Sequence, residues 1–148
     1  MKNVPAPIPP RVLLVDDKRD GLLVRRALLE EAGYTVEVAH NGEEGFELFQ
    51  ASNFDVVVTN YRMPLMNGVE LIARIRQSNP NARTVLISGL VEPLGLTEEN
   101  TGADSVIAKS ANEAGHLMRA VKRLLNAGKR KPPSSQAGGT KRLRASVR

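Results

Sequence analysis

The sequence predicts one α/β domain over residues 11–127, a doubly wound (βα)5 fold with a five-stranded parallel sheet. Short apolar runs alternate with helical patterns five times along the chain, which favours strand–helix–strand units with right-handed crossovers. The first run, Val-Leu-Leu-Val at residues 12–15, is continuously apolar, as in strands that are buried on both faces of a parallel sheet. Aromatic residues are only 3% of the chain, so its core must consist of Val, Leu, Ile and Ala.

The strands and the first helix follow from these patterns. We expect strands at residues 11–15, 35–39, 54–59, 83–88 and 105–108. Between the first two strands, a helix carries apolar residues about one turn apart and is closed by Gly33. These apolar residues are Leu22, Leu23, Ala27 and Leu28. The adjacent Arg25 and Arg26 are expected on a solvated face of that helix.

The later helices show similar signals. Asn41 is a suitable N-cap for a second helix that carries Phe46 and Phe49. A third helix begins near Gly68 and ends before Pro80. The residues expected to face the core are Leu71, Ile72 and Ile75 in the third helix and Leu117, Val121 and Leu124 in the last.

The segment 90–104 is a poor helix, although a fourth helix belongs there in this fold. It contains Pro93 and Gly95, and its apolar residues lack helical spacing. We therefore expect this helix to be short, shifted or partly unwound.

The positive charge of the chain is concentrated at one end. The net charge is +5, but residues 128–148 contain seven basic residues and no acid, which leaves 14 basic and 16 acidic side chains in residues 1–127. This tail is predicted to be disordered, and the proline-rich residues 1–10 an extended lead-in. The tail is expected to be solvated or a linker. Weak, salt-sensitive contact with nucleic acid is the alternative, although the tail has no aromatic residue for base stacking.

Composition also excludes several classes of protein. The chain has no cysteine, so disulfides, thiolate metal sites and a cysteine nucleophile are excluded. No apolar run approaches the roughly 20 residues that span a bilayer. The N-terminal residues lack the apolar stretch of a signal peptide, so we expect a cytoplasmic protein without a membrane partner.

Polar residues follow four of the five predicted strands at their carboxyl ends. They are Asp16 and Asp17, Asn60, Ser88 and Lys109. Doubly wound sheets place their sites at this edge. Two adjacent carboxylates at the end of a buried strand repel each other unless a cation lies beside them. Lys109 or a hard divalent ion is the expected cation.

Four segments resemble the signature segments of response-regulator receiver domains. They are VLLVDD, DVVVTNYRMPLMNG, VLISG and GADSVIAKS, and they occur in that family's order over about residues 11–127. The resemblance implies a flavodoxin-like receiver fold. It also implies that Asp16, Asp17 and a third aspartate hold Mg2+, and that this third aspartate accepts a phosphoryl group from a histidine kinase. Ser88 and Lys109 match the residues that bind the phosphoryl oxygens in that family.

The phosphoacceptor position departs from the family pattern, because Asn60 stands where the third aspartate is expected. An amide oxygen is neutral and a very poor nucleophile, so we expect no acyl phosphate at this position. The interaction of two unit charges 4 Å apart is worth about 4 kcal/mol at an effective dielectric constant of 20, so the loss of one carboxylate weakens the attraction for a metal ion. We therefore expect Mg2+ binding through Asp16 and Asp17 to be weak or lost. The alternative is that Asp16 or Asp17 accepts phosphate instead.

Two further departures concern the readout of phosphorylation. Val106 occupies the position of the aromatic switch residue, and Ser110 replaces the proline that usually follows the lysine. The resemblance and these departures predict a pseudo-receiver in two-component phosphorelay signalling, which is not an enzyme. Its expected partner is a protein, either a histidine kinase pathway component or an output protein. Homodimerisation through residues 90–104 and the last helix is a second expectation.

Overall fold

The computed structural model describes residues 8–127. The predicted basic tail at residues 128–148 lies outside the described residues, as does most of the predicted lead-in at residues 1–10.

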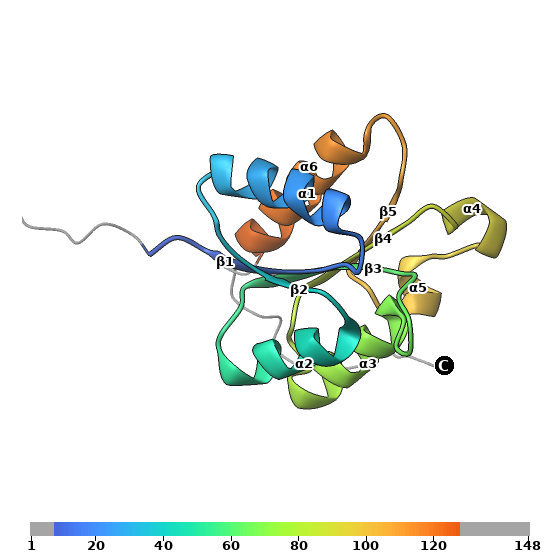
Figure 1. The fold of residues 1–148 in the computed structure, drawn as a ribbon, viewed down its shortest axis with the longest axis horizontal. Helices are drawn as coiled ribbons and strands as arrows, with labels where there is room; N and C mark the ends of the chain where they lie inside the picture. Colours follow the sequence, from blue (N-terminus) through green and yellow to red (C-terminus); the bar gives the residue numbers. More distant parts are fainter. Residues whose placement is uncertain (1–7, 128–148) are drawn as a thin grey trace, which may run out of the picture.

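The structure is a five-stranded parallel sheet with the strand order β2-β1-β3-β4-β5 (Figure 1). The strands are β1 (Arg11–Val15), β2 (Thr35–Ala39), β3 (Val56–Asn60), β4 (Thr84–Ser88) and β5 (Ser105–Ala108). Strands β1, β3 and β4 lie inside the sheet, and β3 and β4 are buried along their whole length. The predicted doubly wound fold is confirmed.

Four long helices cover the sheet, two on each face. Figure 1 shows α1 (Arg19–Glu31) and α6 (Glu113–Ala127) on one face, and α2 (Gly42–Ala51) and α3 (Gly68–Ser78) on the other. The core is correspondingly divided. One apolar cluster joins β-strand residues such as Val12 and Ile87 to α1 and α6, and a second joins Leu13 and Val57 to α3.

The inward face of α1 differs from the prediction. Its buried residues are Leu22, Arg25 and Leu29, whereas Leu23 is 58% exposed and Ala27 is also exposed. The prediction that Leu23 and Ala27 face the core was wrong, as was the placement of Arg25 on a solvated face. The buried stripe has the helical spacing i, i+3, i+7, but an arginine occupies its middle position.

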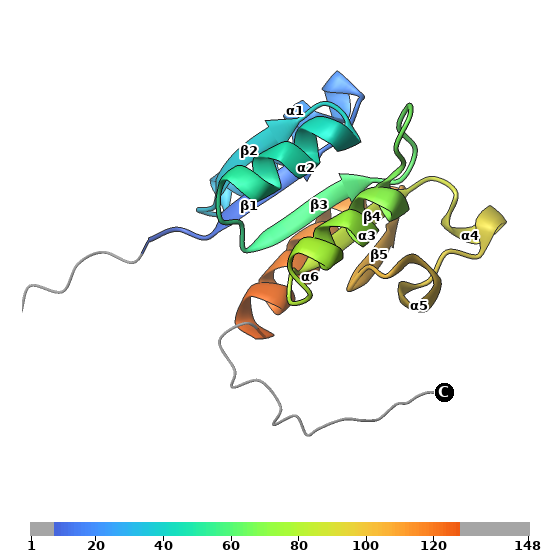
Figure 2. The same cartoon turned by 90° about the horizontal axis from the view of Figure 1, so that it is seen from below.

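The expected defect in the fourth helix is confirmed. Two one-turn helices, α4 (Val91–Leu94) and α5 (Glu98–Thr101), replace it. Pro93 is in the first turn of α4, where the missing N–H is tolerated, and Gly95 ends that helix with a φ of +62°. Figure 2 shows this segment to one side of the sheet, apart from the four long helices.

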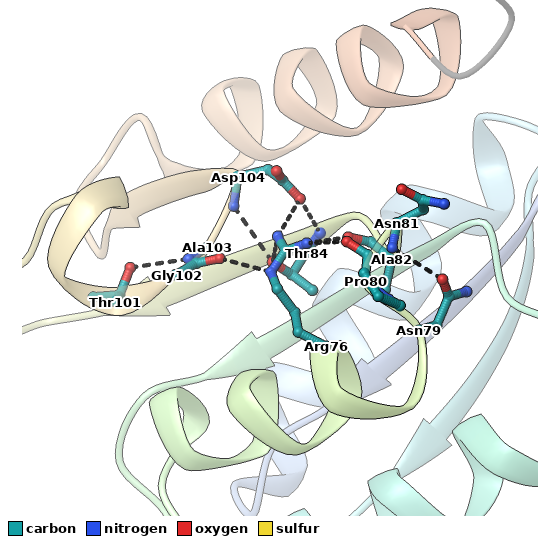
Figure 3. A network of polar contacts seen from close by, with 10 residues as sticks. All are labelled: Arg76, Asn79, Pro80, Asn81, Ala82, Thr84, Thr101, Gly102, Ala103 and Asp104. Atoms are coloured by element: carbon teal, nitrogen blue, oxygen red, sulfur yellow. Dashed lines mark hydrogen bonds and ion pairs between the residues drawn. The ribbon is translucent and has the colours of Figure 1, made fainter. Parts of the chain in front are cut away.

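Arg76 at the end of α3 fastens this irregular segment to the sheet (Figure 3). Its guanidinium donates to the carbonyl oxygens of Gly102 and Ala82 and to the carboxylate of Asp104, at 2.8–3.0 Å. The same Asp104 carboxylate accepts from the backbone N–H of Thr84, at the start of β4. The chain between α5 and β5 is therefore held at the amino-terminal edge of the sheet.

Within residues 8–127, the helices are too short or too polar to cross a lipid bilayer.

Candidate functional site

The polar residues at the strand ends lie along one edge of the sheet. Asp16 and Asp17 follow β1, Asn60 ends β3, and Ser88 ends β4. The register pairs Val15 with Thr59, so the next residues, Asp16 and Asn60, lie level with each other on neighbouring strands. Lys109 follows β5 at the same edge, and its backbone N–H donates to Ser88 O at 3.0 Å.

A buried arginine neutralises the first aspartate. Arg25 Nη1 donates to Asp16 Oδ2 at 2.7 Å, and the side chains of these two residues are 7% and 1% exposed. Arg25 Nε donates in addition to Glu113 Oε2 at 2.7 Å. The expectation that Lys109 pairs with the acids was wrong, because Lys109 is exposed and forms no ion pair within residues 8–127.

The direction of side chains on a helix explains how Arg25 reaches Asp16. Side chains on an α-helix tilt towards its N-terminus, so Arg25 lies over the residue one turn earlier. That residue is Gly21, which has no side chain in the way. The guanidinium can therefore run back along α1 to the end of β1, from which the helix starts.

Arg25 is a permanent positive charge in this environment. Burial acts to lower the pKa of its guanidinium, but hydrogen bonds and charges from Glu113 and then Asp16 outweigh burial and raise that pKa above its ordinary value. One guanidinium thus bridges two carboxylates from β1 and α6, and connects three elements of the fold.

Both carboxylate oxygens of Asp16 are occupied. Oδ2 accepts from Arg25, and Oδ1 accepts from the backbone N–H of Lys18 at 2.9 Å. The backbone N–H of Asp16 donates to Ala39 O on the neighbouring strand. Each carboxylate oxygen of Asp16 therefore accepts one hydrogen bond, and the side chain is closed to solvent.

Asp17 and Asn60, unlike Asp16, each have a side-chain oxygen that accepts no hydrogen bond from the described part of the chain. Asp17 Oδ1 and Asn60 Oδ1 are buried and accept no hydrogen bond from any described residue. The amide of Asn60 is oriented by its Nδ2, which donates to Arg62 O at 2.8 Å. Buried oxygens without a donor are the ligands that a hard cation or an ordered water molecule would take.

The side-chain oxygens of Asp17 and Asn60 are of the type that binds Mg2+, but only Asp17 carries a negative charge. Asp17 and Asn60 would hold the ion; Asp17 Oδ1 has no donor among the described residues, and Asp17 Oδ2 lies 3.9 Å from Lys18 Nζ. The described residues contain no group of three or more His, Cys, Asp or Glu side chains that could bind a metal.

Ser88 and Lys109 match the residues that bind the phosphoryl oxygens in receiver domains, but no hydrogen bond among the described residues directs their side chains to a common point. Ser88 is 2% exposed, and its Oγ accepts from the backbone N–H of Leu90 at 2.8 Å, in the turn after β4. Lys109 projects into solvent, with its Cδ about 4.0 Å from the place where a side chain would begin on Gly89. The Ser88 hydroxyl therefore stabilises the turn after β4.

Val106, at the predicted switch position, is half-buried on β5. It packs against the cluster of Ile72, Leu86 and Ala103. Its backbone N–H donates to Glu98 Oε2 at 3.0 Å, so a side chain from α5 occupies the edge of the sheet at that point. The position carries no aromatic ring that could turn towards Ser88.

Arg25 and Glu113 are the functional residues that sequence reasoning missed. A signal for Arg25 was present, since it lies at i+3 from Leu22 on the apolar stripe and at i+4 from a glycine. No local pattern marks Glu113, because it lies 88 residues from Arg25 in the chain.

Comparison with known proteins points to one family. The family described as response regulator receiver domain matches residues 12–122 of this chain. A response regulator receiver protein of Anaeromyxobacter is 38% identical over 81 residues, which is 55% of this chain and 34% of that protein. The transcriptional regulatory protein CpxR of Escherichia coli is 34% identical over 106 residues, which is 70% of this chain and 44% of CpxR. The chain therefore spans less than half the length of these relatives.

Solved structures of receiver domains share the fold. The response regulator TrrA of Thermotoga maritima, in complex with Mg2+ and BeF, is 31% identical with a TM-score of 0.72, and the match covers 78% of this chain and 99% of TrrA. A receiver domain protein from Clostridium thermocellum is 26% identical with a TM-score of 0.73, and the match covers 81% of this chain and 97% of that one.

Proposed function

The chain belongs to the response regulator receiver domain family of two-component signalling, and we propose that it acts there as a pseudo-receiver. In this proposal it is not phosphorylated at position 60, catalyses no reaction and signals by binding a protein partner in the cytoplasm. The observation that carries the proposal is the side chain of Asn60 at the end of β3. Its amide nitrogen donates to Arg62 O, and its oxygen carries no negative charge.

Phosphoryl transfer to this position needs an anionic oxygen. A carboxylate oxygen forms the new bond to phosphorus as the bond from phosphorus to the donor atom breaks, and no proton has to leave the nucleophile; the donor atom is a nitrogen in phosphohistidine and an oxygen in acetyl phosphate. An amide oxygen is a resonance-stabilised neutral acceptor, and attack would leave it positively charged. The domain therefore lacks the covalent event that biases a receiver between two states.

The environment of the acid pair argues against a substitute acceptor. Asp16 is 1% exposed and both of its oxygens accept hydrogen bonds, so attack would require it to leave Arg25 and the N–H of Lys18. Asp17 is more open, with 21% of its side chain exposed, and is the stronger of the two alternative acceptors. The mass measurement below tests both.

Metal binding is proposed to be weak. TrrA was solved in complex with Mg2+, which supports metal binding by receivers. In this chain the ion would meet the Asp17 carboxylate and the neutral amide oxygen of Asn60, while Asp16 is engaged by Arg25. Fewer free anions mean a lower affinity for a divalent cation.

Charge complementarity supports a homodimer as the partner arrangement. Helix α6 exposes a basic stripe, and the segment 90–104 is acidic; both α4 and α6 contact β5. The stripe is Arg119, Lys122 and Arg123, and the acidic residues of the segment include Glu92, Glu98 and Glu99. We propose that the acidic segment of one copy faces the basic stripe of the other. The electrostatic attraction between these surfaces would weaken as the salt concentration rises.

Intact-mass spectrometry after incubation with acetyl phosphate and Mg2+ tests the central proposal. We expect no phosphoryl adduct on the native chain and one adduct on Asn60→Asp. The control is Asn67→Asp, which adds a carboxylate at the half-buried N-cap of α3, after the loop that follows β3, and should gain no adduct. An adduct on the native chain would contradict the proposal, and peptide mapping would then distinguish Asp16 from Asp17.

Light scattering across a range of concentrations tests the partner arrangement. We expect a dimer fraction that falls at high salt and disappears in Arg119→Glu/Lys122→Glu. The control is Arg26→Glu, which reverses one exposed charge on α1, away from the proposed interface. A chain that stays monomeric at all concentrations would leave the homodimer without support and make an acidic partner protein the remaining candidate for the α6 stripe.

A further inference from the structure

We propose that the Arg25 guanidinium takes the place of a divalent metal ion at the Asp16 carboxylate. It thereby lowers the affinity for such an ion of the acidic edge, the end of the sheet that carries Asp16 and Asp17. This inference stands on Asp16, Arg25 and Glu113 and does not depend on whether position 60 can be phosphorylated.

Direct contact is the first support. Arg25 Nη1 and Asp16 Oδ2 are 2.7 Å apart, and both side chains are almost completely buried. A charge-assisted hydrogen bond of this length in a buried environment is among the strong polar contacts in a protein. The guanidinium carries the positive charge that two adjacent carboxylates at a strand end require.

The second support is that Arg25 is buried and is fixed by a second carboxylate. Its Nε donates to Glu113 Oε2 at 2.7 Å, and only 7% of its side chain is exposed. For a metal ion to take Asp16 as a ligand, the guanidinium would have to give up one carboxylate while remaining buried beside a second positive charge. Both the lost hydrogen bond and the repulsion between like charges oppose metal binding.

A third support comes from the difference between the two aspartates. Both oxygens of Asp16 accept hydrogen bonds, whereas Asp17 Oδ1 accepts none. Arg25 therefore acts on Asp16, whereas Asp17 has only a longer, exposed contact of its Oδ2 with Lys18 Nζ, at 3.9 Å. A metal ion at this edge would have to bind through Asp17, whose Oδ1 accepts no hydrogen bond from a described residue.

The triad has a mechanical consequence as well. Asp16 follows β1, Arg25 is on α1, and Glu113 begins α6. One guanidinium thus ties the first turn of α6 to α1 and to the carboxyl edge of the sheet. Arg25 supplies its positive charge permanently, whereas a metal ion supplies charge only while it is bound. The carboxyl edge of the sheet and the start of α6 are therefore held in one arrangement.

Titration of the full chain with MgCl2 and MnCl2, followed by calorimetry, tests the inference. Arg25→Gln should bind either ion at least about tenfold more tightly than the native chain, because the competing charge at Asp16 is gone. Arg26→Gln is the matched control: it removes the same charge from the next residue, which pairs with Glu30 on the exposed face, and should change the affinity by less than about twofold. The same comparison in the Asn60→Asp background should give the same ratio.

A second variant keeps the test decisive if Arg25→Gln does not fold. Arg25→Leu/Glu113→Leu removes Arg25 together with the carboxylate that its loss would otherwise leave unpaired, so Asp16 is the one member of the triad that stays charged. Millimolar MgCl2 should raise the melting temperature of this double variant and leave that of the native chain almost unchanged, because the freed Asp16 then gains from the ion.

An unchanged or weaker metal affinity in the folded Arg25 variants would overturn the inference and leave the triad a structural ion pair only. That failure is distinguishable from failure of the pseudo-receiver proposal, which is read from the phosphoryl adduct on the native chain and not from metal affinity.

Discussion

A side chain on Gly21 would begin 2.8 Å from Arg25 Nη1 and 3.0 Å from Asp16 Oδ2. Real Cβ atoms are essentially never that close to another heavy atom. Gly21 is therefore the position at which α1 makes room for the guanidinium. A glycine inside a helix costs about 0.5–1 kcal/mol relative to alanine, and here the close approach of Arg25 accounts for it.

The first prediction concerns this contact. Gly21→Ala should lower the free energy of unfolding in urea by about 1–2 kcal/mol, because the new methyl group displaces a buried, ion-paired guanidinium. Gly115→Ala is the control: its Cβ would meet only the end of the Arg119 side chain, at 3.3 Å. That substitution should raise stability, by up to about 1 kcal/mol. Equal gains in the two variants would show that Arg25 does not lie over Gly21.

The second prediction concerns the charge of position 60. In the absence of divalent ions, Asn60→Asp should be less stable than the native chain by about 1–2 kcal/mol, because a further buried carboxylate joins Asp16 and Asp17. Addition of MgCl2 should recover much of this loss in thermal unfolding. Asn67→Asp, at the N-cap of α3, should show neither effect, because aspartate caps a helix as well as asparagine does. An Asn60→Asp variant that is as stable as the native chain without Mg2+ would argue against a crowded acidic edge.

The third prediction concerns Arg76 (Figure 3). Arg76→Met removes the donors to the carbonyl oxygens of Ala82 and Gly102 and to the Asp104 carboxylate. We expect a loss of about 2 kcal/mol in stability and faster hydrogen exchange at residues 97–104. Arg74→Met, on the same helix, removes an exposed ion pair with Glu43 and should have a smaller effect. Unchanged exchange at residues 97–104 would mean that Arg76 does not fasten the segment.

The fourth prediction concerns the edge strand β5. Glu98→Ala should speed hydrogen exchange of the Val106 amide, because that N–H loses its acceptor. Glu99→Ala is the matched control, since it removes the neighbouring acid from the same turn of α5. Similar exchange at Val106 in both variants would contradict a specific role for Glu98.

The sequence by itself determined the class of fold and most of its elements. The predicted strands 11–15, 35–39 and 105–108 match the observed bounds of β1, β2 and β5, and the other two differ by one or two residues at an end. Hydrophobic periodicity and breakers such as Pro93 are local properties, so they identify elements without knowledge of the packing. The parallel topology then places residues 16, 17 and 60 at one edge, because carboxyl ends of parallel strands meet there.

Only the tertiary structure decided which cation neutralises the acids and how α1 is rotated. The sequence predicted Lys109 or a metal ion as the source of positive charge and placed Arg25 on a solvated face, because no local pattern connects Arg25 with Asp16. Arg25 pairs with Asp16 because α1 starts from the same strand end, runs its side chain over Gly21 and meets Glu113 from α6. Such a contact depends on the angle and rotation at which helices pack, which are set by the whole core and not by a short stretch of chain.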